Sequence, residues 1–150
     1  MASKWYVEFA RGNAAGEIDL NADTFYVRLL LANTTAGSQQ AGVNTVADIT
    51  TLDEHAAAGN PVLANIAVNK DDPNLRAEFD ADDVTFNALA ADVSGRNVVG
   101  VLVCRQAGGA PALTDTPCCY LEYTTPKVPD GSNFTIQWSV EGIGHLTVTA

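Results

Sequence analysis

The chain has 150 residues, of which 47% are hydrophobic and 17% charged. This length fits one domain (residues 1–150) with an ordinary core, and this composition excludes a disordered chain. Eight Lys and Arg face 18 Asp and Glu, and the basic residues are scattered singly, so we expect neither nucleic acid nor a membrane as a partner.

The N-terminal segment contains an aromatic pair, Trp5 and Tyr6, and lacks the apolar run of a signal peptide. We therefore expect synthesis and folding in a cytoplasm. Two interpretations of the pair remain open. Residues 1–10 could form an arm whose aromatic side chains anchor to a partner, because Trp and Tyr are enriched at binding hot spots. Alternatively, the pair begins the first core strand.

Apolar and polar residues alternate in several segments, which predicts antiparallel strands with the apolar side facing a core. These segments are Phe25 to Leu31, Leu75 to Phe79, Phe134 to Trp138 and Leu146 to Val148. The turn residues Asp71 to Asn74 predict a hairpin between a strand around Ile66 to Val68 and the strand ending at Phe79.

One segment, Val98 to Cys104, is apolar on both faces and predicts the most central strand. Tyr120 to Tyr123 is expected to pair with it across a long loop from Gln106 to Pro117. No long segment has helical periodicity, although one or two turns are expected at 56–58 and at 85–91. Together these elements predict an all-β fold, either an antiparallel β-sandwich or a jelly-roll-like barrel.

The region 32–60 has the weakest pattern and predicts a long loop, with short strands only around Ala47 to Leu52. Long loops in compact domains are often functional, and here the natural role is contact with a neighbouring subunit. We therefore take Gln39, Gln40 and Asn44 as candidate assembly contacts, together with Trp5 and Tyr6.

The sequence offers little catalytic chemistry. His55 and His145 are the two imidazoles, and neither lies in a motif with a nucleophile. His55 follows two acidic residues and is expected to be solvated, whereas His145 is expected to be structural. We expect no enzymatic activity.

Metal sites are also not expected. The acidic run Asp80 to Asp83 could hold calcium, but its spacing fails the EF-hand pattern, and a turn capped by Asp side chains is favoured. Cys118 and Cys119 should point to opposite faces of a strand, so they are not expected to share a metal. Cys104 could approach one of them, but buried free thiols are favoured. No cofactor is expected.

Four stretches occur in order along nearly the whole chain. They are Lys4-Trp5-Tyr6, Gly16 to Leu30, Ala77 to Phe86, and Gly131 to Trp138 followed by Glu141-Gly142 and a closing Leu-Thr-Val-Thr strand. In these stretches the chain resembles a family of small structural proteins of tailed bacteriophages. The regions 32–60 and 104–119 depart from the resemblance.

The resemblance implies a head decoration protein without catalytic residues. Such a protein would bind the major capsid protein on the outer surface of the virion in many copies, as a homo-oligomer. A tail or head–tail component is the alternative within the same class. A carbohydrate-binding β-sandwich is another alternative, for which exposed Tyr26, Tyr120 and Tyr123 would provide the aromatic surface. An enzyme would need a cleft that unites His55 or His145 with carboxylates.

Overall fold

The computed structural model describes residues 2–147 and shows 37% strand against 8% helix. Every strand pair within the described residues is antiparallel, and no sheet there closes into a barrel. The expected all-β fold is therefore confirmed in its sandwich-like form, and the jelly-roll-like barrel is not what forms.

Nine strands, one α-helix and one short 3-10 helix follow one another along the described residues. Their bounds are β1 Ala2–Trp5, α1 Val7–Ala14, β2 Phe25–Leu31, η1 Val46–Asp48, β3 Ala67–Asp71, β4 Arg76–Asp80, β5 Val84–Phe86, β6 Val98–Arg105, β7 Thr116–Lys127, β8 Phe134–Ile136 and β9 Gly144–Thr147. The sheet orders are β1-β7-β6-β2, β3-β4-β9 and β5-β8.

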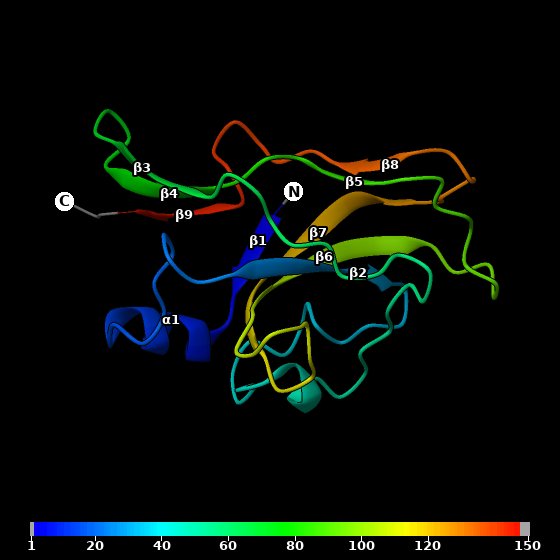
Figure 1. Cartoon of the computed structure of the whole chain (residues 1–150), viewed down its shortest axis with the longest axis horizontal. Coiled ribbons are helices and arrows are strands. Elements are labelled where there is room, and N and C mark those ends of the chain that lie inside the picture. Colours follow the sequence, from blue (N-terminus) through cyan, green and yellow to red (C-terminus); the bar gives the residue numbers. More distant parts are fainter. Residues whose placement is uncertain (1, 148–150) are drawn as a thin grey trace.

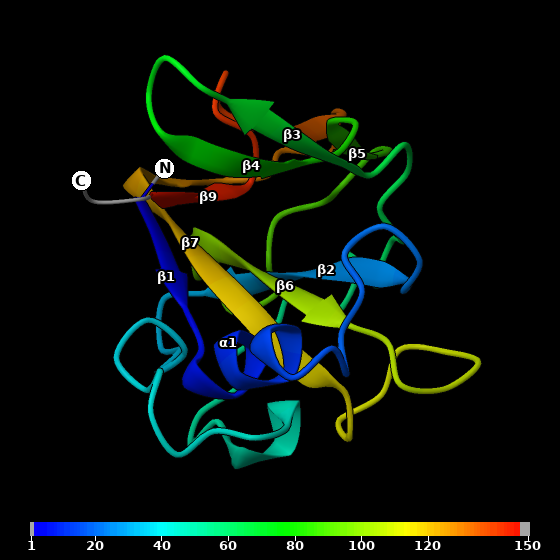
Figure 2. The same cartoon turned by 90° about the vertical axis from the view of Figure 1, so that its left-hand side faces the viewer.

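The sheets form two layers. In Figure 1, β3-β4-β9 and the β5-β8 pair lie above the four-stranded sheet. The rings of Phe25 in β2 and Phe79 in β4 meet edge to face at 5.4 Å between the layers. In Figure 2, helix α1 lies in front of β6 and β7, and both α1 and the loop 32–60 lie below the β3-β4 hairpin. The core between the layers therefore joins segments that are far apart in sequence.

Strands β6 and β7 form the predicted central hairpin. Val98 and residues 100–104 are buried, and β6 lies between β7 and β2. β2 departs from the expected alternation, because all seven of its residues are buried. Its outer edge is covered by residues 53–63, with the Val27 amide donating to the Pro61 carbonyl at 3.0 Å and the Leu31 amide to the Asp53 carbonyl at 2.7 Å.

A buried polar cluster accounts for the polar residues of β2. The Arg28 guanidinium, almost completely buried, donates to the Glu54 carboxylate at 2.7 Å and to the Tyr26 hydroxyl at 3.3 Å. The Tyr26 hydroxyl donates to the Asp115 carboxylate at 2.9 Å, which also accepts the Ala112 amide at 2.6 Å. These hydrogen bonds connect both long loops to β2. Because the polar groups of Tyr26 and Arg28 are satisfied within the protein, they can be buried without contact with solvent.

The hairpin β3-β4 forms around the predicted Asp71–Asn74 turn, but not all apolar residues face inward. Leu75 lies in the turn with φ 52° and is 51% exposed, so the strand begins one residue later. Trp138 lies beyond the end of β8 and is only half-buried. Leu146 is 64% exposed in β9, and Val148 lies outside the described residues.

The N-terminal segment is part of the domain. β1 pairs with β7, and Tyr6 is fully buried, with its hydroxyl donating to the Ala36 carbonyl at 2.8 Å. The structure therefore places Tyr6 in the core, and residues 2–10 form β1 and the start of α1, not the free arm that was considered for residues 1–10. Helix α1 was not predicted, since Phe9 is the one large apolar side chain that it buries.

The loop 32–60 contains no strand. The 3-10 helix η1 replaces the strands expected around Ala47 to Leu52, because the Asp48 carboxylate accepts the backbone amides of Asn44 at 3.0 Å and Thr45 at 2.8 Å. Residues 56–58 form a single hydrogen-bonded turn and not the expected helical turns. The segment 85–91 instead begins within β5 and continues as a turn and an extended stretch.

Candidate functional site

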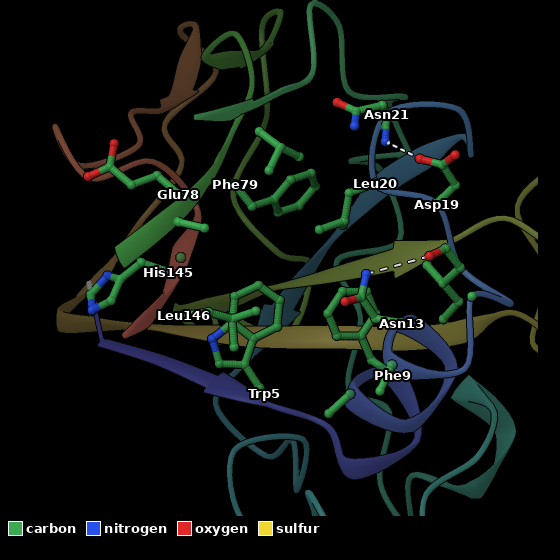
Figure 3. Close-up of a pocket in the computed structure, with 17 residues that line it drawn as sticks. Trp5, Phe9, Asn13, Asp19, Leu20, Asn21, Glu78, Phe79, His145 and Leu146 are labelled. Atoms are coloured by element: carbon green, nitrogen blue, oxygen red, sulfur yellow. Dashed lines mark hydrogen bonds between the residues drawn. The ribbon is translucent and has the colours of Figure 1, made fainter. Parts of the chain in front are cut away.

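An open apolar groove lies in the surface of the described residues. It has a volume of about 660 Å³ and lies between α1, β1 and the β3-β4-β9 sheet (Figure 3). Its lining residues are Trp5, Phe9, Ala10, Asn13, Ala14, Gly16, Ile18, Asp19, Leu20, Asn21, Val68, Ala77, Glu78, Phe79, Gly144, His145 and Leu146.

One wall of the groove is a single face of the three-stranded sheet. The strand register places Val68 opposite Phe79 and Phe79 opposite Gly144, while Ala77 is opposite Leu146. Residues that lie directly opposite one another share a sheet face, so these side chains form one continuous apolar surface. Phe79 is buried beneath it, whereas Val68 and Leu146 remain exposed.

The facing wall is aromatic. The rings of Trp5 and Phe9 stack with centroids 5.2 Å apart and planes inclined by 17° (Figure 3). Trp5 also packs against the backbone of β9, because a Cβ added to Gly144 would lie 2.4 Å from its Cζ2 atom. Glycine at this position therefore lets β1 and β9 approach each other and fixes the width of the groove.

Polar side chains lie at the ends of the groove. Asn13, Asp19 and Asn21 lie at one end in Figure 3, and Glu78 and His145 at the other. The Asp19 carboxylate accepts the Asn21 amide at 2.9 Å and forms no ion pair within residues 2–147. The described lining contains no Lys or Arg and no Ser, Thr, Cys or Tyr. This arrangement suits binding of an apolar group with a positive end.

Of the five candidate assembly contacts, Trp5 alone lines the groove, and Tyr6 is in the core. Gln39 is satisfied within its own loop, since its amide oxygen accepts the Thr50 amide at 3.0 Å and its amide nitrogen donates to the Thr50 hydroxyl at 2.7 Å. The Gln40 side chain donates to the Ala36 carbonyl at 2.7 Å. Asn44 is exposed on the loop, away from the groove.

The histidines do not share a site. His55 was expected to be solvated but is 3% exposed, because its segment pairs with β2 and its amide donates to the Leu29 carbonyl at 2.9 Å. Its Nε2 lies 3.1 Å from the Ala90 carbonyl oxygen, and its Nδ1 is buried without a partner in the described residues. His145 lies in β9, partly exposed, 3.7 Å from the Glu141 carboxylate.

The acidic run connects β4 to β5, and residues 81–83 form no regular turn there. The carboxylates of Asp80, Asp82 and Asp83 accept the Ala81 amide at 2.9 Å, the Asn65 side-chain amide at 2.6 Å and the Trp138 amide at 3.0 Å, respectively. Residues 2–147 hold no group of three or more His, Cys, Asp or Glu placed to bind one metal ion.

The three cysteines are buried free thiols. Burial raises the pKa of the Cys104 thiol to about 12, and it also raises the pKa values of the Cys118 and Cys119 thiols. Because the thiolate is the reactive form, these side chains are chemically inert in the folded state.

The tyrosines do not form an exposed aromatic surface. Tyr26 and Tyr120 are buried. Tyr123 is half-buried, and its hydroxyl is enclosed without a partner in the described residues. The surface that a carbohydrate-binding module would need is therefore not found at these positions.

The groove was not predicted, although one of its walls contains Trp5. The sequence could have indicated the groove through the apolar residues on one side of the β3-β4-β9 sheet. That inference would have required knowing that β9 pairs with β4. Comparison of the chain with known protein families, curated proteins and solved structures found no match. No described helix is long and apolar enough to cross a membrane.

Proposed function

We propose that this chain is a structural protein of a tailed-bacteriophage particle, which coats the outer surface of the head in many copies and stabilises it. The observation that carries the proposal is the open groove, which is lined by an aromatic stack and by an exposed apolar sheet face on an otherwise acidic domain. Exposed apolar hollows of this kind mark binding sites. The resemblance to phage structural proteins supplies the class of partner.

Linkage gives the proposal its mechanism. A protein that binds the assembled lattice, and not free capsid subunits, stabilises the lattice by mass action. Weak contacts add up when an oligomer binds several lattice points at once. The net charge of −10 keeps free copies apart before binding. The partners in this account are the major capsid protein and other copies of the chain.

The same groove could serve a tail or head–tail component, and location separates the two. The carbohydrate-binding alternative loses support because Tyr26 and Tyr120 are buried. The groove does bring His145 together with the Glu78 carboxylate, as an enzyme would need, but its described lining contains no Ser, Thr, Cys or Lys side chain to act as a nucleophile.

Particles with and without the protein test the proposal. Particles that lack it should assemble but lose infectivity at a lower temperature, and purified protein added back should restore heat tolerance. Leu146→Asp, which places a charge in the groove, should fail to restore it. Val140→Asp is the matched control, because Val140 is fully exposed and outside the groove. Equal heat tolerance with and without the protein would contradict the proposal.

A further inference from the structure

We infer that the groove binds an apolar peptide segment of a protein partner, and that the segment carries a Lys or Arg that lies at the Asp19 end. This inference rests on the proposed function, because it specifies what the virion partner must present. It goes further in naming the chemistry of that segment and its orientation.

The size and walls of the groove fit several apolar side chains. Its volume of about 660 Å³ lies within the range of about 300–1,000 Å³ that small-molecule sites have in proteins. The stack of Trp5 and Phe9 lines the hollow together with Leu146 (Figure 3), and Val68 completes the apolar lining. An apolar segment placed between these walls would remove both from water.

The charges give the segment its polarity. The Glu78 carboxylate accepts a hydrogen bond from the Arg76 guanidinium at 2.9 Å, so it already has a cationic partner, which it shares with Asp71 and Glu141. Asp19 at the opposite end is exposed and forms no ion pair within the described residues. With no Lys or Arg in the described lining, a positive group is favoured at Asp19 and a negative group is repelled.

Charge also argues against a second copy of the chain as the occupant. Two copies each carry a net charge of −10, so their approach through an acidic groove is opposed. A partner segment with a basic residue meets no such opposition. A groove-mediated dimer is therefore a result that would overturn the inference.

Trp5 provides a direct readout. The chain has two Trp residues, and Trp138→Phe leaves Trp5, in the groove lining, as the one tryptophan, which can be excited selectively at wavelengths that tyrosine does not absorb. The probes are three N-acetylated, C-amidated octapeptides that share an alternating leucine–serine sequence and end in arginine, glutamine or glutamate. Each is titrated into the Trp138→Phe protein at low salt.

The arginine peptide should bind about threefold more tightly than the glutamine peptide, and the glutamate peptide more weakly than both, as expected for one exposed charge pair. In Asp19→Asn the three peptides should bind alike, while the side-chain oxygen still accepts the Asn21 amide. Asp72→Asn, an exposed carboxylate outside the groove, is the matched control and should leave the preference unchanged. High salt should reduce the preference.

Three results would overturn the inference: no Trp5 response to any peptide at millimolar concentration, equal affinity for all three peptides, or a concentration-dependent dimer that Leu146→Asp abolishes. The experiment uses isolated protein, so its failure is separable from that of the decoration proposal. If the peptides fail while the protein still stabilises particles, the segment chemistry is wrong. If the peptides bind as expected while particles are unaffected, the decoration role is wrong.

Discussion

Gly144→Ala tests the contact that sets the width of the groove. The new Cβ would lie 2.4 Å from Cζ2 and 3.0 Å from Cε2 of Trp5, whereas carbon atoms prefer a separation of about 3.5–4.0 Å. Overpacking of this kind costs about 1–3 kcal/mol. The reduced freedom of the unfolded chain offsets about 0.4–1 kcal/mol, since Gly144 has no left-handed φ that alanine could not adopt.

We therefore expect a net loss of about 1–2 kcal/mol in the free energy of unfolding, measured by urea denaturation. Gly109→Ala is the matched control, because a Cβ there meets nothing within 4 Å, and it should change stability by less than about 0.5 kcal/mol. In a Trp5→Leu background, Gly144→Ala should become nearly neutral or stabilising. A cost that persists after Trp5 is removed would refute the steric explanation.

Three further predictions concern the core. Trp138→Ala should lower the free energy of unfolding by about 1–2 kcal/mol, because the ring is half-buried and its Nε1 donates a hydrogen bond to the Asp82 carbonyl at 2.8 Å. Truncation of a fully buried tryptophan would cost about 3–5 kcal/mol. Urea denaturation measures the loss, and a value above about 3 kcal/mol would contradict the prediction. Arg28→Leu should lower the free energy of unfolding by about 2–4 kcal/mol, because it leaves the Glu54 carboxylate unpaired. The loss should be smaller in a Glu54→Gln background, and an equal loss in both backgrounds would refute the ion-pair explanation. A thiol reagent should label none of the three cysteines in the native protein at pH 8 and all three after unfolding. Because burial raises their pKa values, the unfolded state loses thiol protons first, so stability should fall as the pH rises above about 9, the ordinary thiol pKa; stability that is flat from pH 8 to 11 would contradict this.

The sequence predicted those strands whose pattern is set locally. β6 has apolar residues on both faces and lies centrally, and the Asp71–Asn74 turn produces the β3-β4 hairpin. β2 was predicted as a strand, but its burial depends on residues 53–63 and on the ion pair of Arg28. This burial depends on tertiary contacts, which the apolar–polar pattern of the strand does not reveal.

The groove could not be predicted because it is assembled from three distant segments. Residues 5–21, 68–79 and 144–146 contribute its walls, and each looks unexceptional alone. Leu146 was expected to face a core, and it does lie on the apolar side of its sheet, but that side is left open. Helix α1 was missed for a related reason, since it buries one large side chain and has little amphipathic pattern.

A density map of the intact phage particle tests the central claim most directly. The account predicts this fold in many copies on the outer surface of the head, with Trp5 and Leu146 facing the shell and an apolar segment of the major capsid protein in the groove, its basic side chain beside Asp19. Density for the fold in the tail alone, or its absence from purified particles, would contradict the account.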